Sequence, residues 1–487
     1  MYIILLVFAA AVTALLCLLM RSYRAVAVCA LAGSLAVFVF ALFTVAVWFG
    51  LLPGGYSALK FDGFGAVILT LIATVQLFAV SAGIPYLKAE LEEGTITLSQ
   101  VRWYGALIPL FVISMAVAVS ANGLGLMWIA LEATTLATTM LVAFYTKGGS
   151  LEAAWKYILV CSAGIAIGLI GILLLYYAVY LAGNGADVAS VTWTGLLASA
   201  KTLPPAVVKL AFVFIFIGFG TKVGIVPMHT WLPDAHGRTP SPVSGMLSGV
   251  LLSVALLIIY RAKLVVDAVL GSSAWSDNFF IFFGALSVVV PVCFMIRQKN
   301  YKRLLAYSSI EHMGFAVFAL GFGPAGVVFA LIQIIGHALL KSALFFGTGN
   351  ILLAYKSTKF EKVSAVARNL PRLAVLFTLA LLMLLAVPPS PLFFSELGIF
   401  SLGFASHPYV SAIVLLALVI AAGSFFMNFM PMLFASHEHA QPLHQDKERW
   451  NAVHTVIAAA LTLAAGFGIA LLIGPGGQMI SRIISIN

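Results

Sequence analysis

Charged residues are scarce in this sequence: only 9% of its 487 residues are Asp, Glu, Lys or Arg, whereas 62% are hydrophobic. Soluble domains carry about 25% charged residues, which coat their apolar core. A chain of this composition cannot cover its apolar surface with polar groups, so a soluble globular fold is excluded. A lipid bilayer accepts such a surface, and each spanning helix needs about 20 mostly apolar residues.

Cysteine is also rare, and its spacing gives no sign of a metal or redox centre. The four cysteines are far apart, with no CxxC pair: Cys17, Cys29, Cys161 and Cys293. No GxGxxG motif follows a strand-like stretch, and there is no Walker motif. We therefore expect no metal, nucleotide or other cofactor in this chain. A weak metal candidate is the segment with His437, Glu438, His439 and His444, which a solvated loop explains better.

Apolar stretches of spanning length fill nearly the whole chain and predict an all-α integral membrane protein of about 14 transmembrane helices. They lie near residues 2–20, 25–50, 63–87, 103–120, 123–146, 153–182, 205–230, 243–262, 278–297, 303–322, 324–354, 371–400, 409–434 and 450–474. The first stretch has no basic residues before it, and Arg21 and Arg24 follow it. We interpret it as a retained helix rather than a signal peptide.

The basic residues predict the orientation of these helices. With the N-terminus outside, the cytoplasmic loops hold 18 of the 26 Lys and Arg residues and the outer loops hold 6. By the positive-inside rule, both termini are expected outside, in a multi-pass protein of a prokaryotic-type cytoplasmic (inner) membrane. Arg261 and Lys263 count against this orientation. The same distribution accounts for the net charge of +10 without a nucleic-acid partner.

Two of the predicted helices are interrupted. The seventh contains Gly218, Gly220, Gly224 and Pro227, and the twelfth contains Pro388, Pro389 and Pro391. Proline in a helix interior removes a backbone donor and breaks the helix. Paired interruptions in corresponding places indicate a transporter built from inverted repeats. We expect two inverted five-helix repeats, of helices 4–8 and 9–13; two unrelated kinks are the alternative.

This organisation divides the chain into four parts. Residues 1–100 hold the first three helices, and residues 101–265 and 275–435 form the first and second repeats. Residues 436–487 form a loop and the last helix.

Several ionisable residues lie inside predicted helices, where each costs roughly 2.5–3.5 kcal/mol to insert. They are Glu132, Lys222, Glu311, His312, His337, Lys341 and Glu396. Any one of them alone could be a packing pair or a satisfied core residue. Together they place acids, histidines and lysines on several helices, which is typical of a proton relay. A Glu–Lys pair suits such a relay, because a nearby carboxylate helps a buried lysine to hold its proton.

Four motifs carry a family resemblance. They are TKVGIVPMHTWLPDAH at 221–236, RLLAYSSIEHMG at 303–314, GHALLK at 336–341 and PPSPLFFSE at 388–396. Over roughly residues 100–430, the chain resembles the antiporter-like proton-translocating subunits of respiratory complex I, Mrp-type cation/proton antiporters and membrane-bound hydrogenases. The SSIEHMG and PPSPLFFSE patterns resemble the F-type membrane subunit of group 4 nickel–iron hydrogenases of the formate hydrogenlyase type.

The resemblance implies roles for individual residues. Glu132 and Lys222 match the key pair of that family, and a polar axis continues through residues matching His312, His337 and Lys341 to Glu396. Many relatives carry a lysine in the eighth helix, where this chain has Ser253. Water or Glu311 would have to replace that link between the two half-channels.

These observations predict a proton- or cation-translocating membrane subunit of an energy-converting redox complex, with no redox centre of its own. Such a complex would be a group 4 hydrogenase or an NADH dehydrogenase-like enzyme. The expected partners are other membrane subunits and, through them, a soluble redox arm. A subunit of a multisubunit sodium/proton antiporter is the alternative, and a structural membrane anchor is the third possibility.

Overall fold

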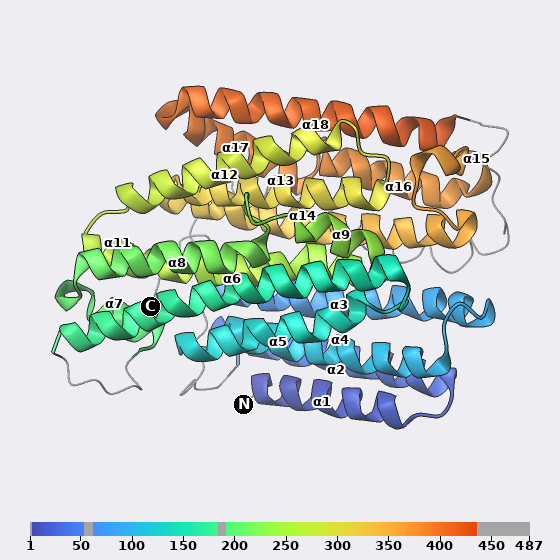
Figure 1. Cartoon of the computed structure of the whole chain (residues 1–487), viewed down its shortest axis with the longest axis horizontal. Coiled ribbons are helices and arrows are strands. Elements are labelled where there is room, and N and C mark those ends of the chain that lie inside the picture. Colours follow the sequence, from blue (N-terminus) through green and yellow to red (C-terminus); the bar gives the residue numbers. More distant parts are fainter. Residues whose placement is uncertain (1, 53–61, 184–190, 436–487) are drawn as a thin grey trace.

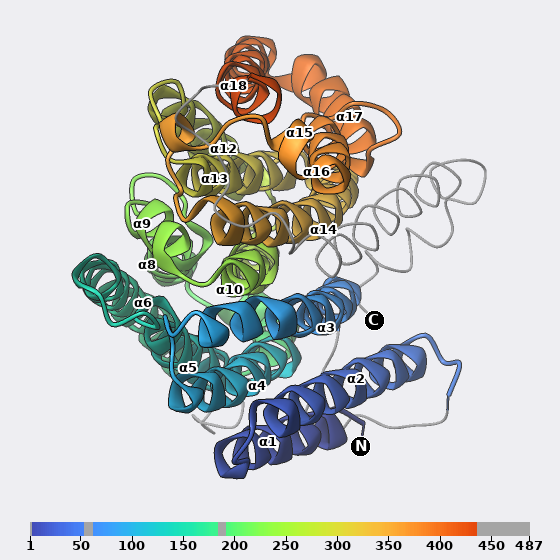
Figure 2. The same cartoon turned by 90° about the vertical axis from the view of Figure 1, so that its right-hand side faces the viewer.

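The computed structural model describes residues 2–52, 62–183 and 191–435, and every structural statement below concerns these residues. They form helices joined by turns, and no β-strand occurs within them. The helices lie side by side along a common direction (Figure 1). Seen from the end of the bundle, α1 and α2 lie at one edge, and α17 and α18 lie at the other (Figure 2).

Eleven helical segments in these ranges are long and apolar enough to cross a membrane. They are α1 (Tyr2–Leu19), α2 (Tyr23–Trp48), α3 (Gly63–Glu92), α4 (Leu98–Ser120), α5 (Leu124–Val142), α6 (Gly148–Leu181), α8 (Pro205–Val223), the continuous segment Ser241–Leu270, α12 (Ala274–Met295), α14 (Gly323–Tyr355) and α18 (Pro408–Phe434). The segment Ser241–Leu270 consists of α10 (Ser241–Met246), a π-helical turn at Leu247–Leu251 and α11 (Leu252–Leu270).

Further helices complete the bundle: α13 (Tyr301–Leu320), α16 (Pro371–Leu384), α17 (Pro391–Ser406) and the short α7 (Trp193–Ala198), α9 (Trp231–Arg238) and α15 (Val366–Asn369). The predicted all-α membrane fold is therefore confirmed. The predicted last helix near 450–474 and the candidate metal loop around His437, Glu438, His439 and His444 lie outside the described residues.

Both predicted helix breaks are present. The first broken helix stops at the end of α8, because Gly224 adopts a left-handed conformation (φ +82°) that residues with a Cβ rarely take. Pro227 follows in the gap before α9. The second break separates α16 from α17 and contains Pro388 and Pro389, while Pro391 is the first residue of α17. Proline suits that first position because the helix needs no donor there.

Each broken helix packs along one long unbroken helix. In the first five-helix unit, α6 runs against α8 and α9. In the second unit, α14 runs against α16 and α17. Each of the two breaks therefore lies beside one long helix, α6 or α14.

Candidate functional site

Lys222 lies in the last turn of α8, beside the first helix break. Its side chain is fully buried, and its ammonium group donates a hydrogen bond of 2.6 Å to the hydroxyl of Tyr157 on α6. The same ammonium lies 4.7 Å from the centre of the Tyr157 ring. The Tyr157 hydroxyl also shares a 2.6 Å hydrogen bond with Thr138 of α5. Three helices therefore meet at one buried cation.

Glycines allow α6 and α8 to approach closely enough for this contact. A Cβ added to Gly171 of α6 would lie 2.6 Å from the backbone oxygen of Ala211 on α8. A Cβ added to Gly218 would collide with the backbone of Gly168. Small residues at a helix interface let two backbones pack tightly within a membrane.

Glu132 of α5 lies near Lys222 without touching it. The Glu132 carboxylate accepts hydrogen bonds from Ser162 at 2.7 Å and from Thr135 at 3.0 Å. No ion pair within 4.0 Å joins Glu132 to Lys222, although the two charges influence each other electrostatically. Glu132 is also only partly buried. Sequence reasoning placed Glu132 and Lys222 together and missed Tyr157, which is bonded directly to the lysine.

A second buried cluster lies between α13, α14 and α17. The Nδ1 atom of His312 is 3.1 Å from the side-chain nitrogen of Gln333 on α14. The side-chain oxygen of Gln333 accepts a hydrogen bond from Ser395 on α17. The rings of His312 and His337 are 5.7 Å apart between centroids. The two histidines were predicted site residues, whereas Gln333 and Ser395, which tie His312 to the second broken helix, were not.

Lys341 lies one turn beyond His337 on α14, as the spacing of four predicts. Its fully buried ammonium donates to the backbone oxygen of Leu305 at 2.9 Å and to the hydroxyl of Ser308. Both ring nitrogens of His337 are buried and have no hydrogen-bond partner among the described residues. Glu311 is 3% exposed and interacts electrostatically with Lys341.

Glu396 lies in the second turn of α17, shortly after the second helix break. The residue is only partly buried. It interacts electrostatically with Glu311, which connects it to the second cluster.

The π-helical turn packs against α14 and is bonded to α13, two helices of the second cluster. Ser253, which stands where many relatives are expected to have lysine, is fully buried and its hydroxyl lacks a partner among the described residues. Within the turn itself, Ser248 shares a 2.7 Å hydrogen bond with Ser309 of α13. This contact joins the last span of the first unit to the helix that carries Glu311 and His312. Local π-helical turns occur often at functional sites.

The TWLPDAH motif forms the far side of the first break. The indole nitrogen of Trp231 donates to the backbone oxygen of Thr221 at 2.7 Å, which ties α9 to the end of α8. The Nδ1 atom of His236 lies 2.9 Å from the oxygen of Leu232, while its buried Nε2 atom has no partner in the described part of the chain. Asp234 forms ion pairs with Arg303 (3.1 Å) and Lys156 (3.4 Å) beside a cavity of about 450 Å³.

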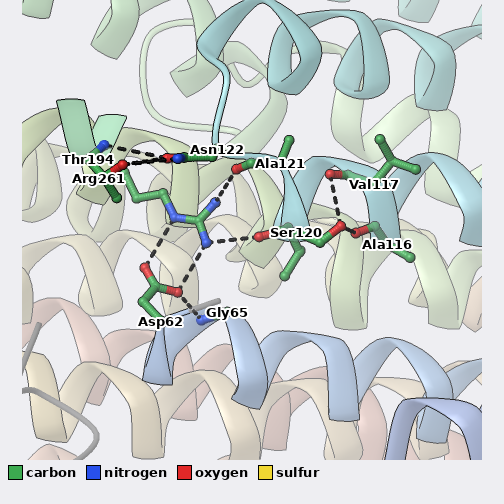
Figure 3. Close-up of polar contacts among 10 residues, drawn as sticks. Asp62, Gly65, Ala116, Val117, Ser120, Ala121, Asn122, Thr194 and Arg261 are labelled. Atoms are coloured by element: carbon green, nitrogen blue, oxygen red, sulfur yellow. Dashed lines mark hydrogen bonds and ion pairs between the residues drawn. The ribbon is translucent and has the colours of Figure 1, made fainter. Parts of the chain in front are cut away.

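The two basic residues that opposed the predicted orientation are both neutralised by acids. Arg261 is fully buried, and two of its nitrogens lie 3.1 Å from the two oxygens of Asp62 (Figure 3). Its guanidinium group also donates to the backbone oxygen of Val119 at 2.8 Å. Lys263 forms ion pairs with Asp267 at 2.6 Å and with Asp277 at 2.8 Å. These bonds explain how both side chains are accommodated at that end of the bundle.

Comparisons with known proteins agree with this architecture. The family described as "NADH:quinone oxidoreductase/Mrp antiporter, TM" matches residues 121–421. The hydrogenase-4 component F homolog of Methylacidiphilum infernorum is 36% identical over 350 residues, which cover 72% of this chain and 73% of that protein.

Two solved structures share the fold. A chain of the archaeal membrane-bound sulfane sulfur reductase superposes with a TM-score of 0.84 at 21% identity, covering 99% of this chain and 97% of the other. A chain of respiratory complex I from Thermus thermophilus superposes with a TM-score of 0.77 at 24% identity, covering 97% and 98%. With the family match spanning both helix breaks, the chain belongs to the NADH:quinone oxidoreductase/Mrp antiporter transmembrane family.

Proposed function

We propose that this chain is the proton-translocating membrane subunit of an energy-converting redox complex of the group 4 hydrogenase type. The observation that carries the proposal is that Lys222 and Lys341 are both fully buried, and neither forms an ion pair among the described residues. A lysine kept only for packing would need a paired carboxylate to offset its desolvation. A lysine that gains and loses a proton needs polar neighbours, and both have hydroxyl groups as partners.

The proposed path runs from Glu132 to Lys222, across the region of Ser248 and Ser309, and on to the second cluster. There Lys341, His337 and His312 carry the proton toward Glu396. Water in the region of Ser253 replaces the lysine expected in many relatives, because that buried hydroxyl has free hydrogen-bonding capacity. The two helix breaks support the proposed proton path, because non-helical backbone at membrane depth is tolerated where it lines a polar path.

The surroundings of Glu132 and Glu396 support membrane partners. Both residues are only partly buried in this chain. A carboxylate facing lipid at this depth is costly, so neighbouring membrane subunits are expected to cover them. We propose that a soluble redox arm acts through those subunits, that this chain holds no cofactor, and that its termini lie outside. The name of the hydrogenase-4 component F homolog supports the hydrogenase assignment.

The test uses the whole complex in vesicles, with proton uptake followed during the redox reaction. Glu132→Gln and Lys222→Ala should each abolish most of the proton uptake while the complex still assembles. Lys209→Ala is the matched control, because Lys209 lies on α8 at its partly exposed end and contacts the ring of Trp275 at 5.5 Å. Wild-type uptake by both site variants would refute the relay and favour a structural membrane anchor.

A subunit of a sodium/proton antiporter is the second candidate, because the matching family includes Mrp antiporters. The two functions differ in their partners. A nickel–iron subunit that copurifies with this chain would support the redox complex. Sodium-dependent proton exchange without any redox reaction would support the antiporter.

A further inference from the structure

A second group of buried ionisable residues lies outside the axis described above. Glu90 on α3 is only 7% exposed. One of its carboxylate oxygens accepts a 2.8 Å hydrogen bond from Tyr145, and its other oxygen is buried without a partner among the described residues. The Tyr145 hydroxyl lies 2.7 Å from the hydroxyl of Tyr86. Because Tyr145 gives its single proton to Glu90, Tyr86 must donate to Tyr145.

This bonding pattern is unlike that of a carboxylate used only for packing. A buried structural carboxylate is expected to have both oxygens bonded, because each unsatisfied oxygen carries a desolvation cost. Tyr145 donates to one oxygen of Glu90, Tyr86 bonds the Tyr145 hydroxyl, and the other oxygen of Glu90 has no partner among the described residues. The second oxygen is therefore free to bind a proton.

Lys302 on α13 is a buried candidate to exchange that proton. It is 1% exposed, and its side-chain nitrogen donates to the backbone oxygen of Thr239 at 2.6 Å, with no ion pair among the described residues. When protonated, it interacts electrostatically with both Glu90 and His236. His236 in turn interacts with Lys341 and with His337 of the second cluster. Pairwise electrostatic interactions thus link Glu90, through Lys302 and His236, to Lys341 of the axis.

The position of Glu90 and Lys302 suits the entrance of a proton path. Glu90 lies in the last turn of α3, and Lys302 lies in the first turn of α13. These helix ends belong to the side that the basic residues predict to be cytoplasmic. Close by, Glu93 and Lys356 form an ion pair at the surface. Glu90 therefore lies within one helical turn of the partly exposed Glu93.

We propose that Glu90 is a proton-loading site, and that Lys302 and His236 join it to the axis at Lys341. A proton from water binds the free oxygen of Glu90 and is released through bridging water to the neutral amine of Lys302. The resulting ammonium then gives a proton to Nε2 of His236, and each donor returns to its starting state. This inference rests on the proposed function, since it needs a working axis to receive the proton.

The experiment compares Glu90→Gln, Glu90→Asp and Glu92→Gln in the whole reconstituted complex. Glu92 is the matched control, because it lies on the same turn, is 61% exposed and pairs only loosely with Lys88, at 3.7 Å. Losing a proton-transfer group commonly slows the step it serves about 10²-fold or more. Glu90→Gln should therefore reduce pumping at least about tenfold, whereas Glu90→Asp should retain part of it and Glu92→Gln all of it.

Two outcomes would overturn the inference: wild-type pumping by Glu90→Gln, or a Glu90→Asp complex that assembles but pumps no better than the Gln variant. Lys222→Ala, measured alongside, separates this result from the proposed function. If Lys222→Ala stops pumping and Glu90→Gln does not, only the loading site is wrong. If neither variant changes pumping, the proposed function itself fails.

If Glu90→Gln does not assemble, the pH profile of Glu90→Asp decides. The titratable groups that face Glu90 are Tyr86 on its own helix, Tyr104 on α4, Tyr145 after α5, Lys302 on α13 and Lys356 after α14. A shorter carboxylate changes its distance from all of these groups. A loading site should then shift the pH at which pumping is half-maximal, and an unchanged profile would mean that Glu90 does not carry the proton.

Discussion

Replacing Tyr157 with phenylalanine tests the environment of Lys222 directly. The variant removes one hydroxyl, and with it the 2.6 Å hydrogen bond from the lysine ammonium. Hydrogen bonds to charged groups contribute about 1.5–3 kcal/mol. Because each 1.4 kcal/mol corresponds to about a factor of ten, the bound geometry of Lys222 should become roughly 10- to 100-fold less populated. If proton transfer uses this geometry, pumping should fall by at least about tenfold.

The fold should tolerate this change, so a loss of proton uptake would report on the missing hydroxyl rather than on misfolding. The phenyl ring keeps its contact with Trp231, whose ring lies 4.9 Å away between centroids, and it still faces the lysine ammonium. The assay is proton uptake by the reconstituted complex at equal amounts of assembled protein. Tyr177→Phe is the control, since Tyr177 lies on the same helix with 51% of its surface exposed. Wild-type uptake by Tyr157→Phe would show that Lys222 works without this hydroxyl.

Three further predictions concern stability and the end of the path. Asp62→Asn leaves Arg261 buried without a carboxylate and should cost about 3 kcal/mol, measured as a lower thermal unfolding midpoint in detergent; an unchanged midpoint would contradict this. Gly171→Val places a Cβ 2.6 Å from a backbone oxygen and should cost about 1–3 kcal/mol of stability. Gly125→Val, whose Cβ would have its nearest neighbour 3.9 Å away, should lower the unfolding midpoint less in the same assay. Glu396→Asp should pump better than Glu396→Gln in vesicles, because it keeps a titratable group; equal pumping by the Gln variant and wild type would remove Glu396 from the path.

The positions of the helices and of the two helix breaks were predictable because each is marked by its own stretch of sequence. Apolar stretches of spanning length locate the helices, since each must satisfy its own backbone within lipid. The two breaks were predictable for the same reason, because Gly224 and Pro389 act on their own backbone. The ionisable residues stand out because lipid makes each of them expensive.

The neutral partners of those residues could not be found in this way. Tyr157 and Gln333 are polar residues of a kind common in membrane helices, and nothing in their local sequence marks them. Their roles come from contacts with helices far away in the chain: Lys222 lies 65 residues after Tyr157, and Ser395 lies 62 residues after Gln333. Only the packing of α6 on α8, and of α14 on α17, creates these pairs.

Glu90 and Lys302 were missed for a different reason: both lie just beyond the ends of the helices predicted from hydropathy. The prediction ended the third helix at residue 87 and began the tenth at residue 303, because charges lower the apolar signal there. In the structure α3 continues to Glu92, and its last turns are amphipathic. Lys88 and Glu92 are four apart and 61% exposed, whereas Glu90, between them, faces inward at 7%. The helical spacing of these three residues was visible in the sequence. The helical periodicity of charged residues therefore needs to be examined at helix ends as well as within the apolar spans.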